Sequence, residues 1–167
     1  MHYTLRLNYP APVPAVGQML ADPAFAAFAA EQTTPDGKVE LVDVSGSADS
    51  GFTVTVRRKI PSSQIPAQFR AFAGAELEIR QAEVYEPEIN GERKGTVALE
   101  IVGTPLIMTG TVKLVPTPDG TAQIYAGDIK VDIPFFGAAI EKAAEEPVRE
   151  ALAFAENAGR EWLNKQT

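Results

Sequence analysis

Two predicted strands carry the side chains that are best suited to chemistry. Alternation along residues 51–60 places Arg58 on the apolar face of its strand, and alternation along residues 76–86 does the same for Glu83 and Tyr85. If these are matching faces of neighbouring strands, Arg58 and Glu83 lie close together inside the fold. Because a buried unpaired charge is costly, they should then form an ion pair or contact a ligand. The alternative is that twist near the strand ends turns both side chains to solvent.

A carboxylate inside a pocket can also act as a general base. Glu83 would do so if its pKa were raised, with Tyr85 or Tyr125 as a hydrogen-bond donor, in a reaction of the cyclase or dehydratase type. Asp128 is a second candidate base, but the alternation in residues 121–133 changes phase nearby and leaves its facing open. Such an enzyme requires the base and the donor to converge in one wet pocket.

The remaining inventory of reactive side chains is small. The only histidine, His2, lies at a chain end, and the chain has no cysteine. A Ser–His–Asp triad, a multi-histidine metal site and thiol chemistry therefore have no support in the sequence. We expect neither a metal nor a cofactor, and we expect a binding protein rather than an enzyme.

Composition narrows the class of protein further. The chain has 167 residues, 45% of them hydrophobic, which predicts one compact domain over residues 1–167. Its net charge of -7 argues against nucleic-acid binding, which needs clustered lysine and arginine. The chain has no run of 18 apolar residues, and its first residues lack a basic segment followed by a continuous apolar one, so we expect no membrane span, no secretory signal and a cytoplasmic location. The oligomeric state does not follow from the sequence.

The elements that must position these side chains form a simple order. Residues 3–9 alternate as a half-buried strand, and residues 13–21 and 23–31 have helical spacing. From Lys38 onward the apolar period changes to two. Short, turn-rich connections then predict an antiparallel meander of six strands, at residues 38–46, 51–60, 76–86, 94–102, 106–115 and 121–133.

A long helix is predicted over residues 134–167. Its apolar stripe contains Phe136, Ile140, Ala144, Val148, Ala151, Phe154, Ala155, Ala158 and Trp162. Pro147 lies inside this helix and should kink it, because it removes the hydrogen bond to the carbonyl of Ala143. The predicted fold is therefore α+β: a curved seven-stranded antiparallel sheet, with two short helices after strand one and a long kinked C-terminal helix on the concave face.

This order resembles the START-related (SRPBCC, helix-grip) superfamily, and the resemblance covers the whole chain. The residues that carry it are Pro23, Ile60, Pro61, Pro66, Phe69, Phe72, Glu83, Tyr85, Gly103, Thr104, Pro105, Gly127, Asp128, Val131, Ile133, Pro134, Gly137, Ile140 and Glu141. Within the superfamily the chain looks like an uncharacterised bacterial branch, a domain of unknown function known mainly from actinobacteria. Members of that branch often have tryptophan where this chain has Tyr85. The resemblance implies a hydrophobic cavity between sheet and C-terminal helix, and no settled activity.

The expected function is binding of a hydrophobic or amphipathic small molecule, such as a lipid, an isoprenoid or a polyketide-like compound. The expected ligand-binding residues are Arg58, Phe69, Phe72, Glu83, Tyr85, Met108, Tyr125 and Ile140. One alternative is the cyclase or dehydratase described above. A second alternative is an interaction protein with a filled core, whose helical pair at residues 13–31 contacts a partner.

Overall fold

The structure is a computed structural model that describes residues 1–64, 67–70 and 74–166. Its elements, in order, are β1 (His2–Tyr9), α1 (Val13–Leu20), α2 (Pro23–Gln32), β2 (Lys38–Ser47), β3 (Gly51–Pro61), the 3₁₀ helix η1 (Ser62–Gln64), α3 (Ala67–Arg70), β4 (Glu76–Tyr85), β5 (Arg93–Ile101), β6 (Leu106–Thr117), β7 (Gly120–Val131), α4 (Gly137–Ala143) and α5 (Glu145–Lys165). The predicted strands and short helices agree with these bounds to within about two residues.

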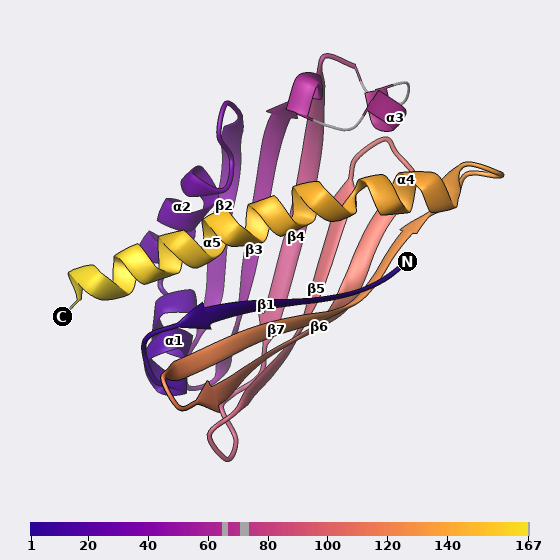
Figure 1. Ribbon diagram of the computed structural model, residues 1–167. Helices are drawn as coiled ribbons and strands as arrows, with labels where there is room; N and C mark the ends of the chain where they lie inside the picture. Colours follow the sequence, from indigo (N-terminus) through magenta and orange to yellow (C-terminus); the bar gives the residue numbers. More distant parts are fainter. Residues whose placement is uncertain (65–66, 71–73, 167) are drawn as a thin grey trace.

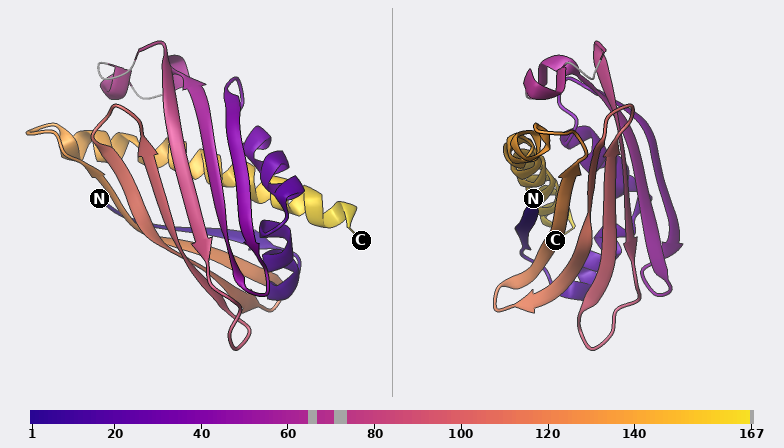
Figure 2. Two further views of the ribbon diagram at one scale, coloured as in Figure 1. Left: turned by 180° about the vertical axis from the view of Figure 1, so that it is seen from behind. Right: turned by 90° about the vertical axis from the view of Figure 1, so that its right-hand side faces the viewer.

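One seven-stranded antiparallel sheet organises the chain. Its strand order is β1-β7-β6-β5-β4-β3-β2, so the six predicted meander strands are confirmed as consecutive neighbours. β1 pairs with β7 at the far end of the meander, with Leu5 opposite Tyr125, and this leaves β1 and β2 as the two edges. The sheet is strongly curved, and α5 runs obliquely across its concave face (Figures 1 and 2).

The core lies between the concave face and the helices. Alternate side chains of β1 are buried, as the sequence pattern predicted. α2 packs against β2 and against the C-terminal half of α5, whereas α1 packs against α2 and against β6 and β7 (Figure 1). The helix-grip α+β architecture expected from the sequence is thus confirmed.

The C-terminal half of α5 packs tightly against the sheet and α2. Gly159 lies against the ring of Tyr9, and a Cβ at this position would be 2.3 Å from Tyr9 Cε1. The rings of Phe25 and Phe28 lie 5.6 and 5.7 Å from the ring of Trp162. Glycine at position 159 therefore allows the helix to approach β1 closely.

The break in the C-terminal helix is confirmed, but its position differs from the simplest expectation. α4 ends at Ala143 and α5 begins at Glu145, so Ala144 separates the two segments. Pro147 lies in the first turn of α5, where a missing N–H is tolerated because the first amide groups of a helix have no partner within it. The proline thus starts a new helix rather than bending a continuous one.

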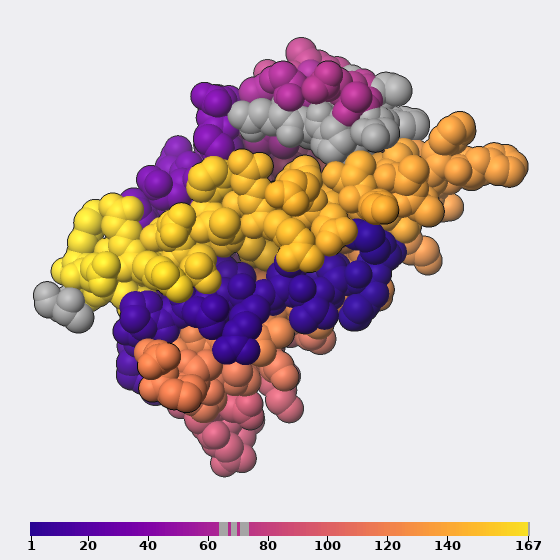
Figure 3. Space-filling view, in the orientation of Figure 1, coloured from indigo at the N-terminus to yellow at the C-terminus, as the bar shows by residue number. Residues whose placement is uncertain are grey.

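The start of the predicted helix was wrong. α4 begins only at Gly137, and Phe136, which the stripe placed in the core, is 66% exposed. The neighbouring Phe135 has φ +68° and is fully exposed, at 101%. This left-handed residue turns the chain away from the core before the helix starts. The loop between β7 and α4 projects from the body of the molecule (Figure 3).

No single helix in the described ranges is long and apolar enough to cross a membrane. The bent pair α1 and α2, with 79° between its two members, reaches the required length and composition only when the two helices are taken together.

Candidate functional site

A pocket with a volume of about 470 Å³ lies between the concave face of the sheet and the N-terminal half of α5. It is lined by Thr33, Pro35, Asp36, Arg58, Ile60, Ile79, Gln81, Leu99, Ile101, Leu106, Met108, Ile129, Ala144, Pro147, Val148, Glu150, Ala151 and Phe154. We call this space the large pocket. Its size lies within the range of small-molecule sites in proteins.

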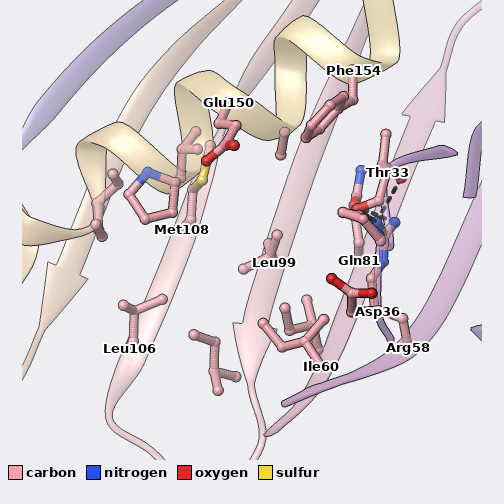
Figure 4. A pocket seen from close by; sticks show the side chains of 18 residues that line it. Thr33, Asp36, Arg58, Ile60, Gln81, Leu99, Leu106, Met108, Glu150 and Phe154 are labelled. Atoms are coloured by element: carbon pink, nitrogen blue, oxygen red, sulfur yellow. Dashed lines mark hydrogen bonds between the residues drawn. The ribbon is translucent and has the colours of Figure 1, made fainter. Parts of the chain in front are cut away.

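The large pocket has an apolar end and a polar end (Figure 4). Side chains of β5 and β6, including Leu99, Leu106 and Met108, form the apolar end beneath the first turns of α5. Arg58 and Gln81, from β3 and β4, form the polar end. Such a lining suits a molecule whose ends differ in polarity.

Small residues at the start of α5 and just before it leave room for this pocket. Ala144 and Ala151 line it, where larger side chains would reach the sheet. Two acidic side chains, Asp36 and Glu150, also line the pocket and are exposed, together with part of Phe154. Solvent therefore reaches the pocket between the α2–β2 connection and α5.

A second space of about 140 Å³, here called the polar chamber, adjoins the large pocket. The two share four lining residues, namely Thr33, Arg58, Gln81 and Ala151. The polar chamber is also lined by Tyr9, Glu83, Tyr85, Gln123 and Tyr125, beneath α2 and the middle of α5. The site thus has two connected parts, both lined largely by apolar side chains, and the hydrogen-bonded polar groups gather in the smaller one.

Glu83 accepts hydrogen bonds from three side chains on the concave face. Tyr85 Oη donates to its Oε2 over 2.6 Å, and Tyr125 Oη donates to its Oε1 over 3.0 Å. Gln81 Nε2 donates to the same Oε1 over 3.1 Å. Three convergent donors stabilise a carboxylate in its ionised form.

Arg58 is connected to Glu83 through Gln81. Arg58 Nη2 donates to Gln81 Oε1 over 3.2 Å, which turns the amide nitrogen of Gln81 toward Glu83. Arg58 Nη1 donates to Thr33 Oγ1 over 2.8 Å. Arg58 is only 8% exposed, and its Nε is buried with no hydrogen-bond partner among the described residues. Arg58 and Glu83 thus both face inward, as alternation predicted, but Gln81 lies between them and the described residues show no direct ion pair of the two.

A further branch leads from Glu83 to β1. Gln123 Nε2 donates to Tyr85 Oη over 2.7 Å, and Tyr9 Oη donates to Gln123 Oε1 over 3.0 Å. Gln123 is 2% exposed, and its amide oxygen and nitrogen are held by two buried partners, Tyr9 at 4% exposed and Tyr85 at 2% exposed. Each donor along the branch points toward Glu83, and the network is therefore directional.

Burial shifts the pKa values in this network. It raises the pKa of Glu83 from its ordinary value of 4.5, while the hydrogen bonds from Tyr85, Tyr125 and Gln81, and the charge of Arg58, act in the opposite direction. Burial lowers the pKa of Arg58, and the negative charge of Glu83 partly offsets this. Burial and the nearby Glu83 raise the pKa values of Tyr85 and Tyr125 well above 10.0, so both keep the protons that they donate.

Four of the residues expected to bind a ligand come together here. Arg58, Glu83, Tyr85 and Tyr125 all line the polar chamber, and Arg58 lines the large pocket as well. Met108, a fifth, lines only the large pocket of the two. Alternation along β3, β4, β6 and β7 was therefore a sound guide to which side chains face the site.

The other three expected ligand-binding residues lie elsewhere or cannot be placed. Ile140 is buried, at 3% exposed, but it lines neither of these two spaces. The backbone at Phe69 belongs to α3, while the position of its side chain falls outside what the structure describes. Phe72 lies outside the described residues.

The second candidate base, Asp128, lies on the opposite face of the sheet. Its side chain is 68% exposed and lies beside His2, with Nδ1 of the histidine 3.4 Å from Oδ1 of the aspartate. The phase of β7 explains this placement, because Gln123, Tyr125 and Ile129 face inward and Asp128 alternates with them. Asp128 is therefore no part of the site.

Sequence reasoning missed three polar members of the network: Tyr9, Thr33 and Gln123. The signal for two of them was available, because alternation places Tyr9 inward with Leu5 and Leu7, and Gln123 inward with Tyr125. Thr33 follows α2 and carries no periodic signal. Within the described part of the chain, no three His, Asp or Glu side chains gather closely enough to hold a metal ion.

A curved antiparallel sheet that closes around a C-terminal helix defines a helix-grip domain. The chain belongs to a family described as "Protein of unknown function (DUF2505)", whose pattern it matches over residues 4–163. Uncharacterized proteins of Mycobacterium tuberculosis and Mycobacterium bovis are each 28% identical over 117 residues, which cover 68% of this chain and 67% of theirs.

Solved structures share the fold at low sequence identity. A Thermus thermophilus protein is 16% identical, covers 100% of this chain and 99% of its own, and has a TM-score of 0.61. A norcoclaurine synthase mutant from Thalictrum flavum, in complex with a transition-state analogue, is 17% identical, covers 100% and 95%, and has a TM-score of 0.55. These likenesses show a common architecture.

Proposed function

We propose that this chain is a START-related domain that binds an apolar or amphipathic small molecule beneath α5. The observation that carries the proposal is the large pocket of about 470 Å³, with its apolar end under α5 and Arg58 at its polar end. A protein core packed at the usual density would contain no cavity as large as this pocket. The proposed compartment is the cytoplasm, which fractionation of cells would test.

The driving force for binding would come from apolar burial. Each square ångström of apolar ligand surface removed from water contributes about 25 cal/mol, less the cost of association. Leu99 and Ile129 offer rigid walls for this contact, while Met108 can adapt to different shapes. The polar end of the ligand would then lie toward the polar chamber, where Arg58 and Gln81 connect the two spaces.

Two neighbouring residues of β6 provide a matched test. Met108 lines the large pocket, whereas Ile107 lies on the other face of the sheet and is 51% exposed. We expect Met108→Trp to weaken binding of the neutral dye Nile red at least tenfold, because the indole fills the pocket, and Ile107→Trp to leave binding unchanged. Fluorescence titration gives both affinities. Equal affinities in the two variants, together with no bound small molecule in native mass spectra of the purified protein, would overturn the proposal.

A second candidate function is catalysis, with Glu83 as general base. Two observations favour it: burial raises the pKa of Glu83, and the carboxylate lines a chamber that continues into the large pocket. One protein of the same fold is a synthase by name. To distinguish the two functions, wild-type protein and Glu83→Gln are each incubated with cell extract, and the masses of the compounds that they retain are compared. If the protein is an enzyme, the wild type retains product and the variant retains substrate, so the masses differ. If it is a binding protein, both retain the same compound.

The third expectation, an interaction protein with a filled core, has less support. The large pocket shows that the core is not filled in its central part. α1 and α2 lie wholly within the described residues, and neither carries one of the exposed large hydrophobic side chains. Their outer surface therefore lacks the apolar patch that a docking helix pair would present.

A further inference from the structure

Glu83 has an unused capacity to accept a hydrogen bond. A carboxylate offers about four acceptor positions. Among the described side chains, three donors occupy positions on it: Tyr125 and Gln81 at Oε1, and Tyr85 at Oε2. The position that remains is on Oε2, and Glu83 lines the polar chamber. A donor brought by a ligand would complete the set.

Two of the three protein donors are held toward Glu83 by further hydrogen bonds. Gln81 presents its amide nitrogen because Arg58 donates to its oxygen. Tyr85 accepts from Gln123, which leaves its own proton for Glu83. The site therefore presents an oriented acceptor rather than an adaptable polar surface.

In the polar chamber, the charges of Arg58 and Glu83 already balance, while Asp36 and Glu150 add two exposed negative charges to the large pocket. Arg58 supplies one positive charge and Glu83 one negative charge, and Gln81 joins them. A ligand carboxylate would add a second negative charge beside Glu83, and it would also have to pass Asp36 and Glu150 of the large pocket. A ligand ammonium would be attracted by Asp36 and Glu150, but beside Glu83 it would add a second positive charge near buried Arg58. Next to Glu83 either addition is unfavourable, because charge repulsion is strong where water is largely excluded.

We propose that the natural ligand is a neutral apolar molecule that carries a hydroxyl group, an alcohol or a phenol, and that this hydroxyl donates to Glu83 while the apolar body occupies the large pocket. The proposal rests on the proposed function and refines it. Such a site would bind fatty acids and other anionic amphiphiles weakly, although its apolar lining alone would accept them.

Four aromatic probes of similar size test the head group directly at pH 7: naphthalene, 2-naphthol, 2-naphthoate and 2-naphthylmethylammonium. We expect 2-naphthol to bind the wild-type protein about tenfold more tightly than naphthalene, as a hydrogen bond to a charged acceptor allows. The two charged probes should bind at least tenfold more weakly than 2-naphthol. Displacement of Nile red gives all four affinities on one protein.

Two glutamate variants then test whether Glu83 causes the preference for the neutral hydroxyl probe. Glu83→Gln removes the negative charge and leaves Arg58 unbalanced, so the preference for 2-naphthol over 2-naphthoate should fall at least tenfold. Glu100→Gln removes the same charge from β5, at a side chain that is 52% exposed. This control should change the preference less than threefold. A thermal melt shows whether each variant is folded.

The outcomes separate this proposal from the one on which it rests. If none of the four probes displaces the dye, the proposed function fails. If naphthalene and 2-naphthoate bind and 2-naphthol has no advantage over either, the pocket binds ligands and the hydroxyl proposal is overturned. An unchanged preference in folded Glu83→Gln overturns it as well. Should that variant not fold, the order of affinities on the wild-type protein decides the question alone.

Discussion

The two halves of α5 use small residues for opposite purposes. In the C-terminal half, Gly159 and Ala158 allow the helix to approach β1 so closely that a Cβ at position 159 would meet the Tyr9 ring. In the N-terminal half, Ala151 lines the large pocket, as does Ala144 just before the helix begins. The same residue types thus close one end of the concave face and open the other.

This difference follows from what α2 and the sheet present to each half. Aromatic rings fill the closed end, where Phe25 and Phe28 contact Trp162. Leu99, Met108 and Ile129 do not fill the open end, and the break between α4 and α5 lies over it. A small side chain therefore permits close packing only where its partner is large enough to meet the helix.

The largest expected effect is at the closed end. Gly159→Leu should lower the free energy of unfolding by about 3 kcal/mol, because the new side chain must displace the Tyr9 ring from a packed core. Urea denaturation measures the loss. Asn157→Leu, at an exposed position of the same helix, is the control and should change stability by less than about 0.5 kcal/mol. A tolerated leucine at 159 would show that the two halves do not differ.

At the open end, the matching substitution should affect binding instead of stability. Ala151→Leu should leave the free energy of unfolding within about 1 kcal/mol of wild type, because open space receives the side chain. It should weaken Nile red binding at least tenfold, which corresponds to about 1.4 kcal/mol. Fluorescence titration and urea denaturation provide the two values. A large loss of stability here would contradict the presence of the pocket.

A third test concerns the polar chamber between the two halves. Burial raises the pKa of Glu83 above 4.5, so the folded protein holds this proton more tightly than the unfolded chain does. As pH rises from about 4.5 through the raised pKa, the wild-type protein should lose stability relative to Glu83→Gln, by about 1.4 kcal/mol for each unit of the shift.

Urea denaturation of both proteins between about pH 4 and pH 8 measures this difference. The groups that face Glu83 are Arg58, Tyr9, Tyr85 and Tyr125, and all of them keep their protons in this range, so they add no slope of their own. Parallel stability curves for the two proteins would show that Glu83 has the same pKa in the folded and unfolded states.

The smallest expected effect is on the solvent face of α5. Glu161 and Lys165 form an i, i+4 ion pair over 3.3 Å, with side chains that are 54% and 63% exposed. Glu161→Gln should lower the free energy of unfolding by about 0.3 kcal/mol, and 1 M salt should abolish the difference. A loss above about 1 kcal/mol would mean that the solvent face of α5 contributes more to stability than an exposed ion pair is expected to.

The spacing of apolar residues was sufficient to predict the strands and helices, because the period of two in a strand and of 3.6 in a helix can be read from the local sequence. It also placed Arg58, Glu83 and Tyr85 on the inner face before any contact was known. It could not say that Gln81 would join the two charges, because alternation gives the face of a residue and not its partners. The positive φ of Phe135 was hidden for a similar reason, since non-glycine residues seldom adopt it.

The pocket itself lies beyond what periodicity can give. Ala144 and Ala151 satisfied the same apolar stripe as Ala158. Whether a stripe residue touches the sheet depends on the path of the helix, which the break at Ala144 and the contact of Gly159 with Tyr9 determine together. Those are relations between distant segments, and a local pattern does not contain them.

The projecting rings of Phe135 and Phe136 have a practical consequence for every dye assay on this protein. They form an external apolar surface on the loop before α4, and such a surface promotes self-association at high protein concentration. A neutral dye can bind there as well as inside. The double substitution Phe135→Ser and Phe136→Ser should remove this background signal and leave the interior signal intact. Dye titrations of this double variant should therefore report binding in the interior alone.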